Sequence, residues 1–264
     1  MTASELNLRI SVATLVRVLF ENPRDGELML ALERRATLRE GGRAVEVKSQ
    51  PFGGAIRILE PGLLRDSIGD FHFDSARSRL EQDFRIFVRP SAWESVRDFC
   101  IEHLSHVDDA ILETGPEREL AEEFADALKI RLKPDQYAHK PVATVVENDP
   151  APTENIRARG IPTVRVYRIF EATLSDSSLT HAIMTNSESL SDQDLCRLAQ
   201  EDFQNGGKGR ANAVLALPLK CITDYYLGMS LNERNVTILF EKHQLDETVP
   251  AVLEGMTVPK YQRV

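Results

Sequence analysis

Near the middle of the chain stands the stretch that decides its fold, Gly115-Pro116-Glu117-Arg118-Glu119-Leu120-Ala121-Glu122-Glu123-Phe124. We predict that this stretch begins a helix. Because residues three and four apart are neighbours on a helix, Glu119, Glu122 and Glu123 then project together. Like charges held so close repel each other unless water or a cation relieves the repulsion. The stretch therefore predicts either a solvated acidic face or a metal site.

A solvated face is the plainer of these two interpretations. The helix dipole favours acidic residues in a first turn, so Glu117, Glu119 and Glu122 can lie there without binding a ligand. For the acidic helix alone this interpretation is favoured over metal binding, since short motifs often match by chance. The residues that precede the helix decide between the two.

Three extended segments precede the helix. Two apolar runs, Val12 to Phe20 and Leu28 to Leu32, are joined by a turn that contains Pro, Asp and Gly, which predicts a β-hairpin. A third segment, Ala44 to Lys48, leads into Gly53-Gly54. Two adjacent glycines at this place predict a close approach of the backbone or a positive φ angle.

The remainder of the chain alternates helical and extended patterns. Between residues 61 and 114 we predict two helices, Ser75 to Val88 and Ser91 to Leu104, which Pro90 separates. Later patterns predict strands over 142–147 and 163–174, a helix that Ser191 begins and that ends near 205, and a helix over 211–222 that Pro218 interrupts.

The composition excludes several classes of protein. The 264 residues, 42% of them hydrophobic and 28% charged, suffice to bury a large core, and the formal charge of -9 disfavours nucleic acid as a partner. Three widely spaced cysteines without a Cys-x-x-Cys pair indicate a reducing compartment. No apolar run is long enough to span a bilayer, and Met1 to Asn7 lacks the pattern of a secretory signal. We therefore expect a cytoplasmic protein without nucleic-acid or membrane partners.

The glycine pair and the acidic helix together resemble the two halves of the signature of the Nudix pyrophosphohydrolase family. Gly54, five further residues and Glu60 match the first half. The second half is matched by Arg118, Glu119, Leu120, Glu122 and Glu123. The resemblance implies an α/β fold in which a mixed β-sheet is sandwiched between helices, formed by residues 1–264 as a single Nudix-type domain.

The chain departs from the family pattern in two places. Residues 61–117 stand where the family has seven residues, which implies an insertion of about 50 residues. We place this helical insertion at residues 61–115. Ala125-Asp126 stands where the family has Gly and an aliphatic residue, so the helix is expected to continue through Leu128.

The resemblance also implies roles for the matched residues. Glu119, Glu122 and Glu123 would act in catalysis and hold a divalent metal, Mg²⁺ or Mn²⁺, which is commonly bound by a few carboxylates with phosphate oxygens and water. A further acidic ligand is expected after the helix, and Glu147 and Glu171 are both candidates.

Four further residues would shape and support this site. Arg118 would orient a carboxylate, and Glu60 would be its partner. Gly53 and Gly54 would shape the loop over the helix and, with Glu60, line the substrate.

Two basic groups are further candidates for phosphate contacts. The glycine-rich turn at residues 206–210 could cradle a phosphate with its amides, with Lys208 and Arg210 as substrate contacts. It lacks the spacing of a P-loop, and a glycine-rich helix stop is favoured on local grounds. Arg34 and Arg35 either reach a substrate phosphate or flank the sheet, and the second interpretation is preferred.

A histidine-containing group is a weaker metal candidate. His103, His106, Asp108 and Asp109 lie close in sequence, but their spacing matches no strong metal site. A solvated helix end explains them better.

The leading hypothesis is divalent-metal-dependent hydrolysis of a diphosphate linkage in a nucleoside diphosphate derivative. Two alternatives stay open: a catalytically inactive Nudix-type module that binds a nucleotide-like ligand or a protein partner, and an unrelated α/β protein with a coincidental acidic helix. The oligomeric state is also open, with a homodimer as one candidate.

Overall fold

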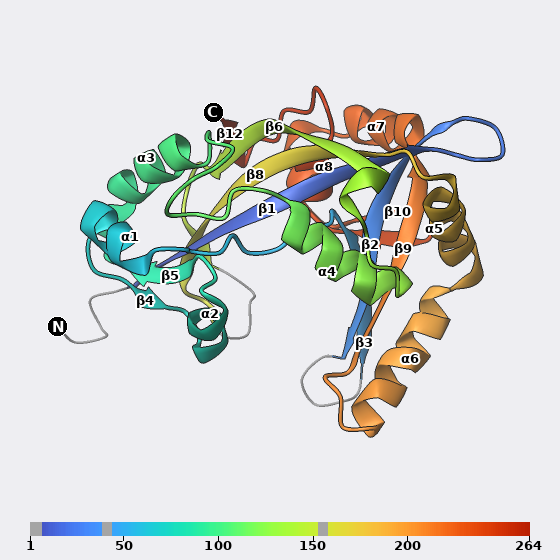
Figure 1. Cartoon of the computed structure of the whole chain (residues 1–264), viewed down its shortest axis with the longest axis horizontal. Helices are drawn as coiled ribbons and strands as arrows, with labels where there is room; N and C mark the ends of the chain where they lie inside the picture. Colours follow the sequence, from blue (N-terminus) through green and yellow to red (C-terminus); the bar gives the residue numbers. More distant parts are fainter. Residues whose placement is uncertain (1–6, 39–43, 153–157) are drawn as a thin grey trace.

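The computed structural model describes residues 7–38, 44–152 and 158–264. Within these residues the chain forms a large mixed β-sheet with helices packed against it (Figure 1), which confirms the α/β class. No helix in the described part is long and apolar enough to cross a lipid bilayer. The amino-terminal stretch that lacks a signal pattern lies, except for Asn7, outside the described residues.

Strand β1 (Leu8–Glu21) is the strand around which the sheet is assembled. One of its edges pairs in parallel with β8 (Pro162–Leu174). The other edge pairs in turn with β2 (Leu28–Leu38), with the segment at residues 52–55, and with β5 (Arg85–Val88), all antiparallel. Because β1 is buried on both faces, most of its residues are apolar.

The predicted hairpin is confirmed by the antiparallel pairing of β1 with β2. Strand β3 (Val45–Gln50) continues the sheet from β2, as the extended pattern at residues 44–48 predicts. Apart from β9, the other strands of the described residues are β4 (His72–Phe73), β6 (Tyr137–Glu147), β7 (Ala151–Pro152), β10 (Ile238–Phe240), β11 (His243–Leu245) and β12 (Tyr261–Arg263). Both later strand predictions, residues 142–147 and 163–174, are therefore confirmed.

Strand β9 (Arg210–Pro218) corrects the prediction of a helix over residues 211–222. Its alanines favour a helix locally, but pairing with β2 along residues 29–37 decides the conformation. Only after Pro218 does the chain form α7 (Leu219–Gly228). Pro218 precedes the first turn of α7, where N–H groups have no partner within the helix, so the missing N–H of the proline costs no helical hydrogen bond.

The free edge of β9 is covered by α5 (Ser177–Ser189). The Asn186 side chain accepts a hydrogen bond from the N–H of Val214 (2.8 Å), and the Ser187 hydroxyl accepts one from the N–H of Ala216 (2.9 Å). These two side chains satisfy donors that an open strand would present to solvent. The next helix, α6 (Asp192–Gln204), begins after Ser191, as predicted, in a capping box with Asp194.

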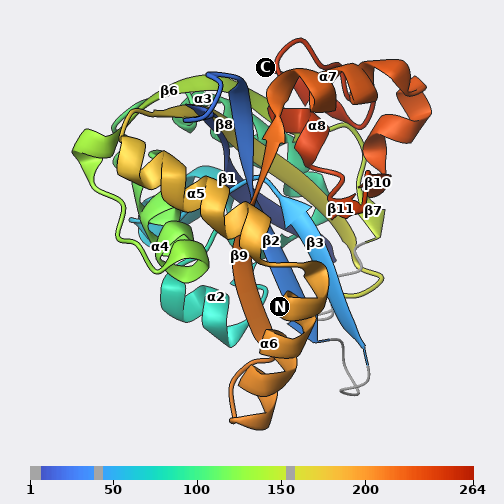
Figure 2. The same cartoon turned by 90° about the vertical axis from the view of Figure 1, so that its right-hand side faces the viewer.

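Helices lie on both faces of the sheet, as Figure 2 shows. Helix α4 (Glu117–Leu128), the predicted acidic helix, packs Leu120 and Phe124 together with α5 against Met29 and Ala31 of β2. The alternate residues of β2 face α7 and α8 (Val249–Val252) on the other side. As predicted, α4 continues through Leu128; it ends at Lys129, whose φ is 60°.

Residues 61–115, the predicted helical insertion, contain strands as well as helices. They form α1 (Pro61–Ile68), α2 (Ala76–Glu81) and α3 (Trp93–His103), but β4 and β5 lie among these helices. The prediction of a helix over residues 75–88 is thus wrong in its second half, because β5 finds a pairing partner in β1. The predicted helix over 91–104 is confirmed as α3, preceded by a short 3₁₀ turn (Pro90–Ala92).

The adjacent glycines confirm the predicted close approach of the backbone. Gly53 has a φ of +141°, and a Cβ atom there would lie 2.0 Å from the carbonyl oxygen of Thr14. The neighbouring Gly54 carbonyl accepts a hydrogen bond from the N–H of Thr14 (2.9 Å). Only glycine lets this segment lie so close to β1.

We expect Gly53→Ala to lower the free energy of unfolding by about 2 kcal/mol or more, because alanine adds both backbone strain and a clash with a backbone oxygen that cannot rotate away. Gly62→Ala is the matched control, since a Cβ atom there meets nothing within 4 Å, and its effect should stay within about 0.5 kcal/mol. Urea unfolding of both variants measures the difference. Equal stabilities would contradict the close approach.

Candidate functional site

The glycine segment and α4 bring four predicted site residues together. The Glu119 carboxylate lies against Gly54, where a Cβ atom would be 2.0 Å from Oε2. The Glu123 carboxylate accepts a hydrogen bond from the N–H of Gly53. Glu119 and Glu123 are buried, whereas the side chain of Glu122 is 60% exposed. The acidic face of α4 is therefore divided between a buried and a solvated part.

Arg118 ties the amino-terminal turn of α4 to its surroundings. Its Nε donates to Glu113 Oε2 (2.6 Å) and its Nη2 donates to the carbonyl oxygen of Ala55 (3.0 Å). Its Nη1 contacts both Glu119 and, at 3.5 Å, Glu122. The guanidinium thus spans the loop before the helix, the glycine segment and the helix itself.

The prediction that Glu60 is the partner of Arg118 is wrong, because Glu113 takes that place. The backbone bridge between Ile58 and Leu112 brings Glu113 alongside the glycine segment. Glu60, in contrast, stands directly before α1 with an exposed side chain, where the chain turns away from α4.

A buried carboxylate from β2 joins the site, and the sequence analysis missed it. Glu33 is 0% exposed and accepts hydrogen bonds from Arg35 Nη2 (2.9 and 2.7 Å) and from Gln50 Nε2 (3.1 Å). Arg35 also lies 3.5 Å from Glu123 Oε1. The signal was the charged run Glu33-Arg34-Arg35 directly after the apolar run, because a strand that continues through it places Glu33 and Arg35 on one face.

The two arginines of β2 have different surroundings, because neighbouring residues on a strand point to opposite faces. Arg34 is buried on the other face, donates to the carbonyl oxygen of Leu190 and lies 3.5 Å from Asp192. The preferred interpretation, that both merely flank the sheet, thus does not describe Arg35, which contacts the acidic helix.

Burial and like charge raise the pKa values of the two buried carboxyls of α4. Burial raises the pKa of Glu123 well above its ordinary value, and the charge of Glu33 adds to this, against the opposing effects of the Gly53 N–H and Arg35. Burial also raises the pKa of Glu119, although Arg118 opposes it. Carboxylates outnumber guanidinium groups here, so a bound cation would balance part of the remaining negative charge.

The three α4 glutamates do not form a preassembled metal site. In the described residues, one group of three potential ligands has all its ligand atoms within 4.8 Å of one another, and it lies elsewhere, at the end of α3. On α4, Arg118 contacts Glu119 and Glu122, while Glu123 faces Gly53 and Arg35. Metal binding by these three residues stays a prediction.

Neither candidate for a further acidic ligand lies near α4. Phe170 and Ala172 of β8 pack on the face that carries α4, so Glu171 between them points to the opposite face, where it pairs with Arg17 and Lys140. Glu147 is also on that opposite face.

Glu147 is fully committed to structural contacts. Its carboxylate accepts hydrogen bonds from the side chain (2.9 Å) and the N–H (2.7 Å) of Arg165 and lies 2.8 Å from Lys260 Nζ. Neither Glu147 nor Glu171 is thus placed to supply the expected further ligand. The additional acidic residue beside α4 is Glu33.

The glycine-rich turn at residues 206–210 is not an open phosphate cradle. The Asp202 carboxylate accepts hydrogen bonds from the N–H groups of Gly209 (2.9 Å) and Arg210 (3.2 Å), which uses the amides a phosphate would need. Lys208 and Arg210 lie at this turn between α6 and β9, and Arg210 pairs with Thr37 of β2. The favoured explanation, a helix stop, agrees with this arrangement.

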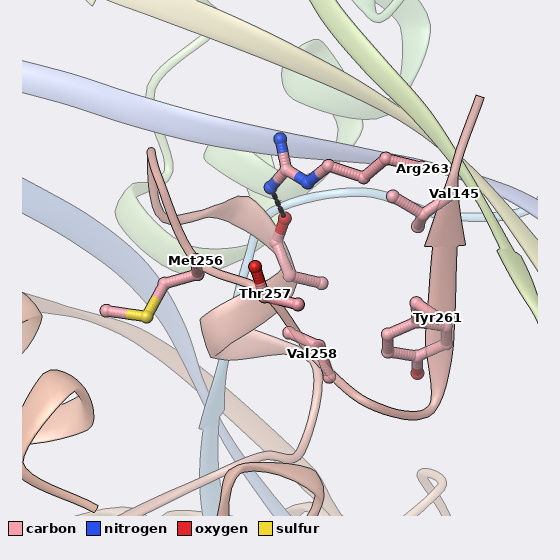
Figure 3. A pocket seen from close by; sticks show the side chains of 7 residues that line it. Val145, Met256, Thr257, Val258, Tyr261 and Arg263 are labelled. Atoms are coloured by element: carbon pink, nitrogen blue, oxygen red, sulfur yellow. Dashed lines mark hydrogen bonds between the residues drawn. The ribbon is translucent and has the colours of Figure 1, made fainter. Parts of the chain in front are cut away.

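A separate pocket of about 130 Å³ is shown in Figure 3. Its residues Val145, Ala251 and Tyr261 belong to the core cluster on the face of the sheet opposite α4. It lies between β6, α8 and β12 and contains none of the predicted site residues. In it, Arg263 donates a hydrogen bond to the carbonyl oxygen of Ala251 (3.0 Å). The other lining residues are Val145, Met256, Thr257, Val258 and Tyr261, most of them apolar.

Comparison with known proteins gives no match for this chain, whether with protein-family models, with curated proteins or with solved structures. Its function must therefore be inferred from the contacts around α4.

A double-mutant cycle tests which carboxylate is the partner of Arg118. We expect Arg118→Ala and Glu113→Ala to be coupled by about 1 kcal/mol in the free energy of unfolding, because the two side chains form one hydrogen-bonded pair. The matched cycle of Arg118→Ala with Glu60→Ala should show coupling within about 0.3 kcal/mol. Urea titrations of the single and double variants measure both values. Stronger coupling to Glu60 would refute the assignment.

The raised pKa of Glu123 predicts a specific dependence of stability on pH. As pH rises above 4.5, the ordinary value for this group, the unfolded chain loses a proton that the folded protein keeps, so wild-type stability falls. We expect Glu123→Gln to be more stable than the wild type near neutral pH in metal-free buffer, by about 1 kcal/mol or more. The gain should shrink as pH is lowered towards 4.5.

Thermal and urea unfolding followed by circular dichroism across this pH range measure the effect. Glu117→Gln, on the exposed side of the same helix, serves as the control. If Glu123→Gln is no more stable than the wild type at any pH, the burial of the Glu123 carboxyl does not destabilise the folded protein.

Proposed function

We propose that α4 and the Gly53-Gly54 segment form the active site of a Nudix-type pyrophosphohydrolase, which hydrolyses a diphosphate linkage in a nucleoside diphosphate derivative. The observation that carries this proposal is the excess of buried negative charge. Glu33, Glu119 and Glu123 are buried side by side from two elements, with Arg35 and Arg118 as their guanidinium partners.

The donor atoms of this group suit a hard divalent cation such as Mg²⁺ or Mn²⁺, which prefers oxygen ligands. Glu119, Glu122 and Glu123 are the residues that would hold it. When bound, the cation would offset the charge of the diphosphate and make a water molecule more nucleophilic. A cation would also relieve the repulsion between Glu33 and Glu123, which raises the pKa of Glu123.

The residues of the chain supply positioning and proton transfer. Glu123 is held in place by the N–H of Gly53, and its raised pKa brings the carboxylate closer to the basicity that a general base needs near neutral pH. Arg118 binds the Ala55 carbonyl and Glu113, which keeps the helix and the glycine segment in a fixed relation. These contacts support a site in which a proton acceptor is oriented before substrate arrives.

One observation favours the alternative, a non-catalytic module that binds a nucleotide-like ligand. Arg118 already contacts Glu119 and Glu122, so the protein itself offsets part of the charge of these carboxylates. The departure from the family pattern at Ala125-Asp126 points the same way.

Turnover of a panel of nucleoside diphosphate derivatives, with Mg²⁺ or Mn²⁺ and after chelation by EDTA, tests the proposal. We expect metal-dependent product formation, and a loss of about 100-fold or more in kcat/KM for Glu123→Gln, because the variant lacks the proton acceptor. Glu117→Gln on the exposed side of α4 should retain wild-type activity.

Equal activity of Glu123→Gln and the wild type would overturn the assigned mechanism. Calorimetric binding of a nucleotide without turnover and without a metal requirement would instead support the binding module.

A further inference from the structure

A second group of metal-binding residue types lies outside the α4 site, where α3 ends. His103 is in the last turn of α3, and His106 and Asp109 follow in the loop towards α4. One nitrogen atom of each imidazole and one carboxylate oxygen of Asp109 lie within 4.8 Å of one another. The sequence pattern favours a solvated helix end here, but the fold of the loop brings these three residues together.

The carboxylate of Asp109 is held in place by the backbone. Its Oδ1 accepts hydrogen bonds from the N–H groups of Ile111 (2.9 Å) and Leu112 (2.8 Å). Its Oδ2 lies 2.7 Å from Nδ1 of His103 and 3.5 Å from Nδ1 of His106. The side chain is 5% exposed, so one oxygen is anchored and the other is aimed at two imidazoles.

The two histidines leave one side of the group open. The ring of His103 stacks on Phe99 with ring centroids 4.0 Å apart, which closes the side towards the core. The side chain of His106 is 54% exposed. Three protein ligands with one open side is the arrangement in which zinc keeps a water molecule or an external ligand in its fourth position.

We propose that His103, His106 and Asp109 form a binding site for a divalent transition metal of the Zn²⁺ class, with a solvent molecule or an external anion as the remaining ligand. Two imidazoles and one carboxylate suit Zn²⁺, whereas Mg²⁺ prefers sites built of oxygen atoms. The site is therefore chemically distinct from the glutamates of α4 and does not depend on the function proposed for them.

The position of the site connects it to α4 through the backbone. Asp109 binds the amide of Leu112, Leu112 pairs with Ile58, and the next residue, Glu113, binds Arg118. A metal held by α3 and Asp109 fixes the loop at two points. Zn²⁺ should therefore raise the thermal stability of the chain as well as bind to it.

The experiment uses the full chain, stripped of metal by EDTA and transferred to chelator-free buffer. Isothermal titration with ZnCl₂ is done in excess Mg²⁺, which occupies oxygen sites such as the α4 glutamates. We expect one Zn²⁺ per chain, an increase in melting temperature, and with Co²⁺ the visible absorption bands of a four-coordinate site. Binding should weaken at low pH, where protons compete for the imidazoles.

Three variants and one control make the result specific. His106→Ala changes an exposed position and leaves the core intact, and Asp109→Asn keeps an oxygen acceptor for the two amides. Each should weaken Zn²⁺ binding by about 100-fold or more, because the loss of a metal ligand weakens binding more than the loss of an outer-shell partner. Glu123→Gln should leave the affinity unchanged. So should His181→Ala, the control, an exposed histidine on α5.

Absence of Zn²⁺ binding to the wild type would overturn the proposal. Wild-type affinity in both His106→Ala and Asp109→Asn would overturn it as well, and so would a loss of Zn²⁺ binding in Glu123→Gln, which would place the metal on α4.

Discussion

The structure depends on the close contact between the Gly53-Gly54 segment and β1. Glycine at position 53 lets the segment lie against the Thr14 carbonyl at a distance that a side chain would prevent. Held there, the segment presents the Gly53 N–H to Glu123 and the Ala55 carbonyl to Arg118. A single piece of backbone thereby fixes the acidic helix relative to the central strand, and the charges of the site follow from that placement.

Much of the fold could be predicted because hydrophobic patterning and turn chemistry are local signals. The β1–β2 hairpin, β8, α3 and the start of α6 all follow from such patterns. Strand β9 and the strand at Arg85–Val88 could not be predicted in this way, because their extended conformation comes from pairing with β2 and β1. Strands distant in sequence thus determine the conformation of these segments, against the helical conformation that their own residues predict.

In the candidate site, too, some contacts follow from local sequence patterns and others do not. Helical spacing alone identifies Glu119 and Glu123 as neighbours, and the paired glycines indicate where the backbone approaches them. Glu33 and Glu113 join through strand pairing and loop closure, which no spacing rule encodes. Asp109 reaches its histidines in the same manner, through a loop whose shape depends on its amide contacts.

The covering of β9 by α5 has a consequence for self-association. Because Asn186 and Ser187 occupy donors of that strand, another chain cannot extend the sheet there by adding a strand of its own. The outer edge of β6 differs, because β12 pairs there only with Val145, Val146 and Glu147. Residues 137–143 of β6 pair with β8 on one side, and no other strand of the described residues pairs with them on the other. A second copy that joins through a continuous sheet would therefore add its strand at this edge of β6 and not at β9.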